Sequence, residues 1–203
     1  MKTLFDENLT LEEAKELIKN GADVNEIDDG GKTPIFYANT KKLVQYLIET
    51  GANVNHKDHY GLTPLCHDIN IKIANTLIKN GADVNALDGN HYTPLHCARS
   101  PKIIKLLVEH GANINARSKD NESVLDCYSN MKTLKLLISY GAIFSELDTY
   151  KMFSYLFNDE QKNAFDTFAM LASCDDDFFH MCLAYQDGIK NNIKLDVTDM
   201  DIL

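Results

Sequence analysis

Apolar residues recur with helical spacing in separate stretches of the chain, and each stretch is followed by polar residues and a Gly-Ala pair. In four stretches they return at positions i, i+3 and i+4, which is the pattern of a helix that buries one face. The residues on these faces are Leu43, Val44, Leu47 and Ile48; Ile71, Ile73, Leu77 and Ile78; Ile103, Ile104, Leu106 and Leu107; and Leu134, Leu136 and Leu137. The pattern predicts four amphipathic helices that share one core, and we expect Leu106 to be buried in it.

The Gly-Ala pairs recur at a spacing of 30 residues. The five pairs are Gly21-Ala22, Gly51-Ala52, Gly81-Ala82, Gly111-Ala112 and Gly141-Ala142. Glycine is suited to end each helix in the left-handed backbone conformation, which other residues adopt at a cost. A unit of this size cannot bury its own apolar face, so the copies are expected to stack on one another.

Each full unit begins with Thr or Ser, which can cap a helix, and three of the four continue with Pro, which suits the first helical turn. These starts are Thr33-Pro34-Ile35, Thr63-Pro64-Leu65, Thr93-Pro94-Leu95 and Ser123-Val124-Leu125. A stretch such as Asp23-Val24-Asn25 and a turn sequence such as Asp29-Gly30 precede the start. Each unit therefore reads as a hairpin-like loop, a short helix, a turn and a longer helix.

These units resemble the ankyrin repeat family, whose signature is Thr-Pro-Leu-His-x-Ala. Residues 93–98 carry this signature in full, and residues 33–38 and 63–68 carry it in part. The resemblance implies an all-α solenoid. The usual period is about 33 residues, and the missing residues fall between the Ala38 or Ala98 position and the second helix. We therefore expect a tightened first helix, a smaller groove surface and a larger role in recognition for the hairpin tips.

The repeat divides the chain into six parts. Four ankyrin repeats are expected at residues 28–57, 58–87, 88–117 and 118–147, between an N-terminal half-repeat at 1–27 and a C-terminal cap with its tail at 148–203. In the half-repeat, Thr10-Leu11-Glu12-Glu13 has the sequence of a capping box and predicts a helix over residues 11–19. In the C-terminal part, apolar residues such as Tyr150, Phe153 and Leu156 keep helical spacing. This part is therefore predicted to be helical.

The net charge of −10 is unevenly distributed along the chain. Residues 148–203 contain 11 Asp and Glu residues against 4 Lys, so they supply −7 and leave −3 for the first 147 residues. An acidic protein is poorly suited to non-specific binding of nucleic acid, which needs cations opposite the phosphates. It is well suited to a basic protein partner.

The sequence predicts neither a membrane segment nor a targeting signal. No apolar run approaches the ~20 residues that span a bilayer. The first residues turn acidic by Asp6 and lack an apolar core, which favours a cytoplasmic location.

The five cysteines, Cys66, Cys97, Cys127, Cys174 and Cys182, are odd in number and lack the spacing of a disulfide framework. Because Cys97 and Cys127 occupy the same position in successive repeats, they are expected to lie too far apart for a bridge. Reduced, partly buried thiols are the expectation.

Residue patterns for metal, cofactor and catalytic sites are weak, so none of these is predicted. His67, Cys97 and Cys127 share a column of the repeats, but neighbouring members of a column are too far apart to converge on zinc. Asp175-Asp176-Asp177 lacks the Gly and Glu of a calcium loop and reads as a solvated helix start. By the resemblance, His96 has a structural role.

The hairpin tips are the first candidate binding surface, because partner contacts in the ankyrin family cluster there and on the adjacent concave face. The candidate residues are Lys32, Lys57, His59, Tyr60, Leu62, Asn90, His91, Tyr92, Arg117 and Lys119. Exposed aromatic residues such as Tyr60 and Tyr92 are typical hot spots, although packing between the tips would explain them equally well. His91 stands where the first two tips have Gly31 and Gly61, so a distorted third tip is expected.

A second candidate surface lies in the C-terminal cap and comprises Asp175, Asp176, Asp177 and Phe178. Its carboxylates could stand in for phosphates on a basic partner and speed association. A cap that is only solvated, with its aromatic residue buried, is the alternative.

These observations predict a non-enzymatic protein-binding module, in particular an inhibitor or immunity-type protein that sequesters one protein partner with a basic surface. Two alternatives remain open at this stage. One is an adaptor that recruits a host complex through the C-terminal cap. The other is an enzyme with its site in the C-terminal region.

Overall fold

The computed structural model describes residues 2–67, 70–128 and 130–143, which fall into two compact units, residues 1–122 and 123–203. The predicted C-terminal cap, with Asp175, Asp176, Asp177 and Phe178, lies outside the described residues. Each unit is considered by itself below.

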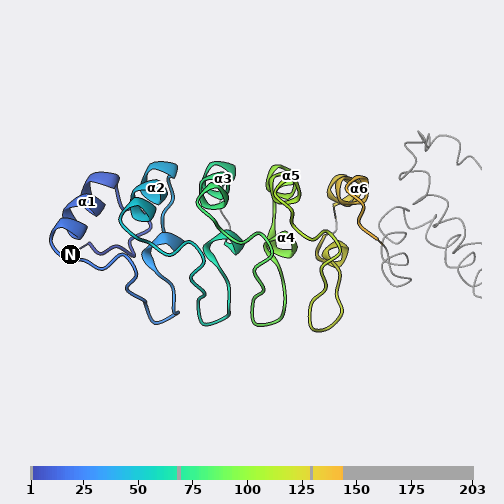
Figure 1. Ribbon diagram of the computed structural model, residues 1–203, viewed down its shortest axis with the longest axis horizontal. Coiled ribbons are helices and arrows are strands. Elements are labelled where there is room, and N and C mark those ends of the chain that lie inside the picture. Colours follow the sequence, from blue (N-terminus) through green and yellow to red (C-terminus); the bar gives the residue numbers. More distant parts are fainter. Residues whose placement is uncertain (1, 68–69, 129, 144–203) are drawn as a thin grey trace, which may run out of the picture. The chain divides into compact units, whose positions relative to one another are not determined.

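The longer helices of the first unit stand side by side in one row, and the loops all extend in one direction (Figure 1). These helices are α1 (Leu11–Lys19), α2 (Lys41–Glu49), α3 (Ile71–Lys79) and α5 (Pro101–Glu109). Each spans 9 residues. This row confirms the predicted helices and gives the first unit the architecture of an all-α repeat stack.

A second row is formed by the first helix of each repeat, which is a single turn. It contains η1 (Pro34–Phe36), η2 (Pro64–Cys66) and α4 (Pro94–Cys97). Proline occupies the first turn of each, as its missing N–H favours. The tightened first helix expected from the short period is confirmed. Thr33 and Thr63 stand at the N-cap positions, but their side chains cap no backbone N–H.

The core of the first unit is a column of equivalent apolar residues. Leu47, Leu77 and Leu107 are 0–1% exposed, and Ile35, Leu65 and Leu95 from the short helices are 0–3% exposed. Leu106 is only half-buried, so the expectation for this residue was wrong. The repeat column runs through the next residue, Leu107, since helix geometry turns Leu106 about 100° away from it.

Each helix ends as predicted at a left-handed glycine. Gly21, Gly51, Gly81 and Gly111 have φ between 87° and 104°. The amide N–H of the following alanine bonds back into the last turn, for example Ala52 N–H to the Leu47 carbonyl. This geometry satisfies helix carbonyls that would otherwise lack partners.

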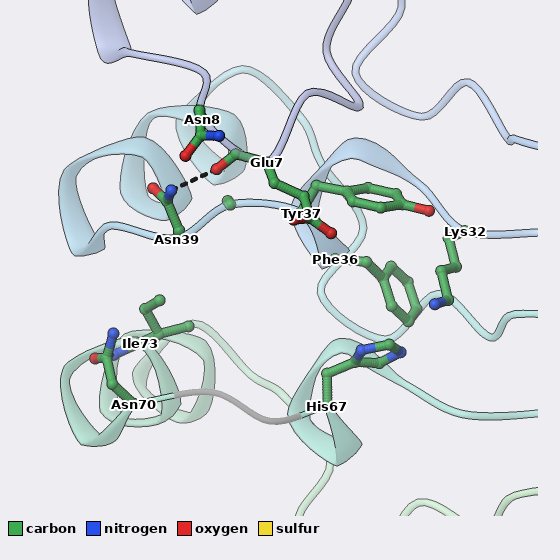
Figure 2. Close-up of a pocket in the computed structure, with 10 residues that line it drawn as sticks. Glu7, Asn8, Lys32, Phe36, Tyr37, Asn39, His67, Asn70 and Ile73 are labelled. Carbon is green, nitrogen blue, oxygen red and sulfur yellow. Dashed lines mark hydrogen bonds between the residues drawn. The ribbon is translucent and has the colours of Figure 1, made fainter.

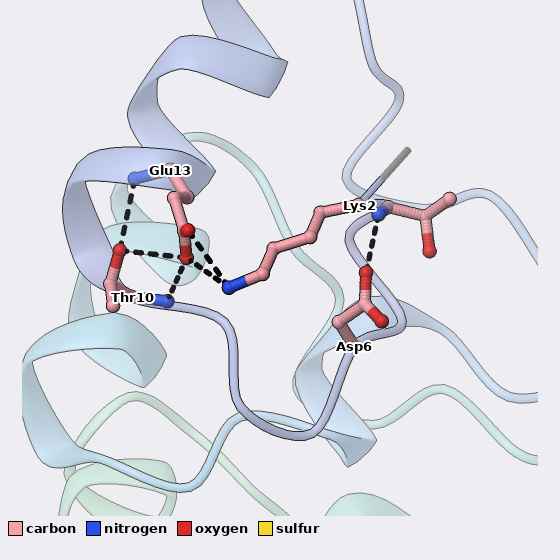
Figure 3. Close-up of polar contacts among 5 residues, drawn as sticks. Lys2, Asp6, Thr10 and Glu13 are labelled. Atoms are coloured by element: carbon pink, nitrogen blue, oxygen red, sulfur yellow. Dashed lines mark hydrogen bonds and ion pairs between the residues drawn. The ribbon is translucent and has the colours of Figure 1, made fainter.

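The half-repeat begins with the predicted capping box (Figure 3). Glu13 N–H donates to Thr10 Oγ1, while the Glu13 carboxylate accepts from Thr10 N–H at 2.9 Å. Lys2 Nζ reaches the same carboxylate at 2.8 Å. These donors lower the pKa of Glu13 to about 2, the Lys2 ammonium making the largest contribution.

The described part of the second unit contains η3 (Val124–Cys127) and α6 (Met131–Ser139). Val124, Leu125 and Leu137 are 0–5% exposed. The pair repeats the short and long helices of the first unit, and the second helix again ends at a left-handed glycine, Gly141. Within the described residues, no helix is long and apolar enough to cross a bilayer.

Candidate hairpin-tip binding surface

Every tip in the first unit is closed by the side chain of the residue that opens it. In the first tip, Asp28 Oδ1 accepts hydrogen bonds from the backbone N–H groups of Gly30 and Lys32 at 2.8 and 2.9 Å. Asp58 and Asp88 repeat this pair of bonds in the next two tips. Because the aspartate holds the turn from within, the outer side chains start from a fixed backbone.

Neighbouring tips are joined by one backbone hydrogen bond at each step. His59 N–H donates to the Gly30 carbonyl at 3.0 Å and Gly89 N–H to the Tyr60 carbonyl at 2.8 Å. Lys119 N–H donates to the Asn90 carbonyl at 2.9 Å. The four tips therefore form one continuous, pre-organised edge along the first unit (Figure 1).

The third tip keeps the same geometry as the others, so the expected distortion at His91 was wrong. His91 adopts φ of 65°, as Gly31 and Gly61 do at 75° and 81°. Its N–H still donates to the Asp88 carbonyl at 3.1 Å. Asn121 has the equivalent left-handed conformation in the fourth tip, with φ of 62°. The hydrogen bonds of the turn outweigh the steric cost of a side chain in the left-handed region.

The aromatic residues proposed for the tips differ in their surroundings. Tyr60 is 74% exposed. Tyr92 is half-buried: its ring lies edge-on to His96 at 5.3 Å between centroids, and its hydroxyl donates to the Glu122 carboxylate of the next tip. Leu62 is also half-buried. Tyr60 is therefore the most accessible of the three, while Tyr92 makes contact between tips.

The other proposed residues occupy the same edge. Lys57, His59, Asn90, His91 and Lys119 are exposed, while Lys32 and Arg117 are half-buried. Lys57 Nζ donates to the Leu87 carbonyl at 2.7 Å, and Lys119 Nζ donates to the Gly89 carbonyl. The side chain of each lysine therefore makes a hydrogen bond to a neighbouring repeat and keeps its charge at the surface.

Sequence comparison now identifies the repeat. The family model for ankyrin repeats (3 copies) matches residues 6–88, 39–118 and 68–149. The chain belongs to the ankyrin repeat family. The search of curated proteins found no match. Ankyrin repeats are protein–protein interaction modules, and the family is generally not enzymatic.

An asparagine ladder, which sequence reasoning missed, joins the ankyrin repeats below the tips. Asn55 Nδ2 donates to the Gly81 carbonyl at 2.9 Å, while Asn55 Oδ1 accepts from Asp83 N–H at 2.8 Å. Asn25 and Asn85 make the same two bonds to their following repeats. The signal was present in the sequence as an Asn four residues after each Gly, but it was read only as part of an extended stretch.

His96 has a structural setting, and its Nδ1 contacts Thr93 of its own repeat. Its Nδ1 accepts from Thr93 N–H at 3.0 Å and lies 2.8 Å from Thr93 Oγ1. The residue is 6% exposed, and burial lowers the pKa of its imidazole because the charged form loses solvation. The neutral imidazole acts as the cap that the other full repeats of this unit lack.

The described cysteines are free thiols, as expected, and two of the three are partly buried. Cys127 is exposed, whereas Cys66 and Cys97 are half-buried. The contact between repeats joins Cys66 to Cys97, which are offset by one position in their repeats, and the Cys97 thiol lowers the pKa of Cys66 to about 7. Among the described residues, no group of three His, Cys, Asp or Glu side chains is placed to hold a metal ion.

A hollow of about 480 Å³ lies beside the first tip and was not predicted. Its lining includes Lys32 from the tip, Phe36 from the first short helix, Tyr37 directly after that helix, and His67 from the second repeat (Figure 2). Its apolar and polar groups come from residues widely separated in sequence, so only the fold brings them together.

Proposed function

We propose that this protein is an inhibitor or immunity-type protein that sequesters one protein partner through its hairpin tips. The observation that carries the proposal is the continuous tip edge, closed by Asp28, Asp58 and Asp88 and joined from tip to tip by backbone hydrogen bonds. A pre-organised edge loses little conformational entropy on binding, which favours tight association with one partner over weak association with many.

Tyr60 is the proposed anchor of this surface. A tyrosine that is 74% exposed provides a large contact area with few side-chain torsions to immobilise. Lys57, which precedes it by three residues, and His59 offer polar contacts around the ring. Lys32, Leu62, Asn90, His91, Tyr92, Arg117 and Lys119 form the remainder of the proposed surface.

The charge distribution supports a partner with two kinds of surface. The tips carry Lys32, Lys57, Arg117 and Lys119 together with carboxylates such as Asp29 and Asp120, so they suit a part of the partner with mixed charge. The proposed basic part of the partner would meet the acidic residues after position 148, in particular Asp175, Asp176, Asp177 and Phe178. Opposite charges on the two proteins raise the association rate, and salt screens that attraction.

The proposal is tested by affinity co-purification of the full chain from its native cell at low and raised salt, followed by mass spectrometry. The expected result is one protein, with a basic surface, that is held near stoichiometrically and released in part by salt. Several subunits of a larger assembly would contradict sequestration. Capture that is indifferent to salt would contradict the electrostatic part of the proposal.

A further inference from the structure

The hollow beside the first tip follows from the short period of these repeats. The first short helix ends at Phe36 and α2 starts at Lys41, so only four residues connect them. A usual ankyrin repeat has about three more residues in the unit. Without them, the space between the residue 36–39 segment and the second repeat is left open, and Ile73 and His67 line its far side (Figure 2).

The walls of the hollow are fixed by contacts within the protein. The Phe36 ring packs edge-on against His67, with 5.1 Å between centroids. The Tyr37 hydroxyl donates to the Asp28 carboxylate, and Asn39 Nδ2 donates to the Glu7 carbonyl (Figure 2). A site with such walls does not have to be assembled when a partner arrives.

One wall presents the Lys32 ammonium, whose charge acts on the neighbouring Asp28 carboxylate and helps to lower its pKa. Lys32 Nζ lies 5.9 Å from the centroid of the Tyr37 ring, and within the described part of the chain it forms no ion pair. The nearby Asp28 carboxylate already accepts from the Tyr37 hydroxyl and from two backbone N–H groups. An ammonium group has three N–H donors, so Lys32 keeps donors for a partner.

His67 adds a second polar group close to Lys32. Its Nε2 is buried and has no hydrogen-bond partner among the described residues. Burial and the nearby Lys32 ammonium lower the pKa of the imidazole, so the neutral form is favoured. A single acceptor that approaches Lys32 here would sit against the Phe36 ring and beside His67.

We propose that the hollow receives an Asp or Glu side chain of the protein partner, with its carboxylate on Lys32 and an adjacent apolar residue against Phe36. The proposal rests on the proposed function, since it names the chemistry of one contact in that complex. The volume of the hollow lies within the ~300–1,000 Å³ typical of ligand sites. It therefore has room for an acidic side chain and part of a neighbouring residue.

Glu7 provides an internal test of the charge argument, because this acidic residue also lines the hollow. Its carboxylate opposes an incoming carboxylate, while Lys32 attracts it. Glu7→Gln is therefore expected to tighten binding of an acidic peptide, and Lys32→Met is expected to weaken it.

The experiment uses the folded full chain and a phage-displayed library of random short peptides as the probe. The expected consensus is an Asp or Glu next to an apolar residue. A synthetic peptide from this selection should bind about 5- to 10-fold more weakly when its acidic residue becomes Gln or Asn, and equally so to the Lys32→Met protein. A basic or neutral consensus, or no enrichment, would overturn the proposal.

Lys79→Met is the matched control, since Lys79 is an exposed lysine in the last turn of α3 and belongs neither to the hollow nor to the tips. Peptide affinity should be unchanged in this variant, and equal losses in the two lysine variants would overturn the assignment to the hollow. Because the peptide assay does not use the natural partner, its failure is distinct from a failure of the tip surface. A partner that binds Lys32→Met normally and Tyr60→Ala weakly would leave the tips in place and overturn only this inference.

Discussion

Single residues at the tips determine whether the backbone can turn. The left-handed position is Gly31 in the first tip and Gly61 in the second, but His91 and Asn121 in the other two. The turn is similar in each case because the side chain of the aspartate or serine that opens the tip accepts a hydrogen bond from the backbone N–H four residues later. Asp88 holds the third tip and Ser118 Oγ accepts from Glu122 N–H in the fourth.

His91→Gly is expected to stabilise the protein. The left-handed conformation costs a non-glycine residue about 1–2 kcal/mol, and the added freedom of glycine in the unfolded chain offsets part of this. The free energy of unfolding should rise by about 0.5–1 kcal/mol, measured by urea denaturation.

Gly61→Ala is the opposing control. Gly61 has φ of 81°, and a Cβ there would lie 2.7 Å from the Gly89 nitrogen. This variant should lose more than about 1 kcal/mol. Stabilisation by Gly61→Ala, or destabilisation by His91→Gly, would contradict the description of the tips.

The Glu13 carboxyl is expected to titrate near pH 2, below its ordinary value of 4.5. A lowered pKa in the folded state means that this group stabilises the fold above about pH 4.5, and that the contribution is lost as pH falls toward 2. Carbon-detected NMR of the carboxyl should give this midpoint in the natural protein and a higher one in Lys2→Met. A midpoint near 4.5 in the natural protein would exclude the contact with Lys2.

At the scale of elements, the sequence predicted which helices form but not all of the bonds between them. The apolar stripes and the Gly-Ala period defined α2, α3 and α5 with their glycine ends. The choice between Leu106 and Leu107 failed, because both fit an amphipathic stripe and only the packed neighbours distinguish them. The asparagine ladder and the Cys66–Cys97 contact were missed because they join different repeats at offset positions.

Leu107→Ala should destabilise the stack far more than Leu106→Ala. Leu107 is 0% exposed, and truncation of a fully buried leucine costs about 2–5 kcal/mol. Leu106 is half-buried, so its variant should lose less than this range. Parallel chemical denaturation of the two variants measures the difference, and equal losses would contradict the assigned core.

Asn55→Ala should weaken the coupling between the first and second ankyrin repeats. The change removes two hydrogen bonds near the surface, each worth about 0.5–1.5 kcal/mol. Hydrogen exchange at Asp83 N–H should accelerate, and the free energy of unfolding should fall. Asn90→Ala removes an exposed asparagine side chain from a tip and is the control, so a comparable loss there would argue against the ladder.

At the scale of the whole molecule, the family and the solenoid could be predicted from the sequence, and so could the tips as the candidate surface. The hollow at Phe36 and His67 could not, because it depends on how two short connections pack against each other. The different settings of Tyr60 and Tyr92 were also beyond a sequence pattern, since the Glu122 carboxylate that accepts from the Tyr92 hydroxyl belongs to the next repeat.

The most direct test of the tip surface is the affinity of the purified partner for the Tyr60→Ala protein, measured by isothermal titration calorimetry. We predict that the affinity falls at least tenfold, as expected for a hot spot of about 2 kcal/mol, while the free energy of unfolding stays unchanged. Lys79→Ala, at the exposed end of α3, is the control and should bind the partner normally. Unchanged affinity in the folded Tyr60→Ala protein would contradict the account, and so would a variant that fails to fold.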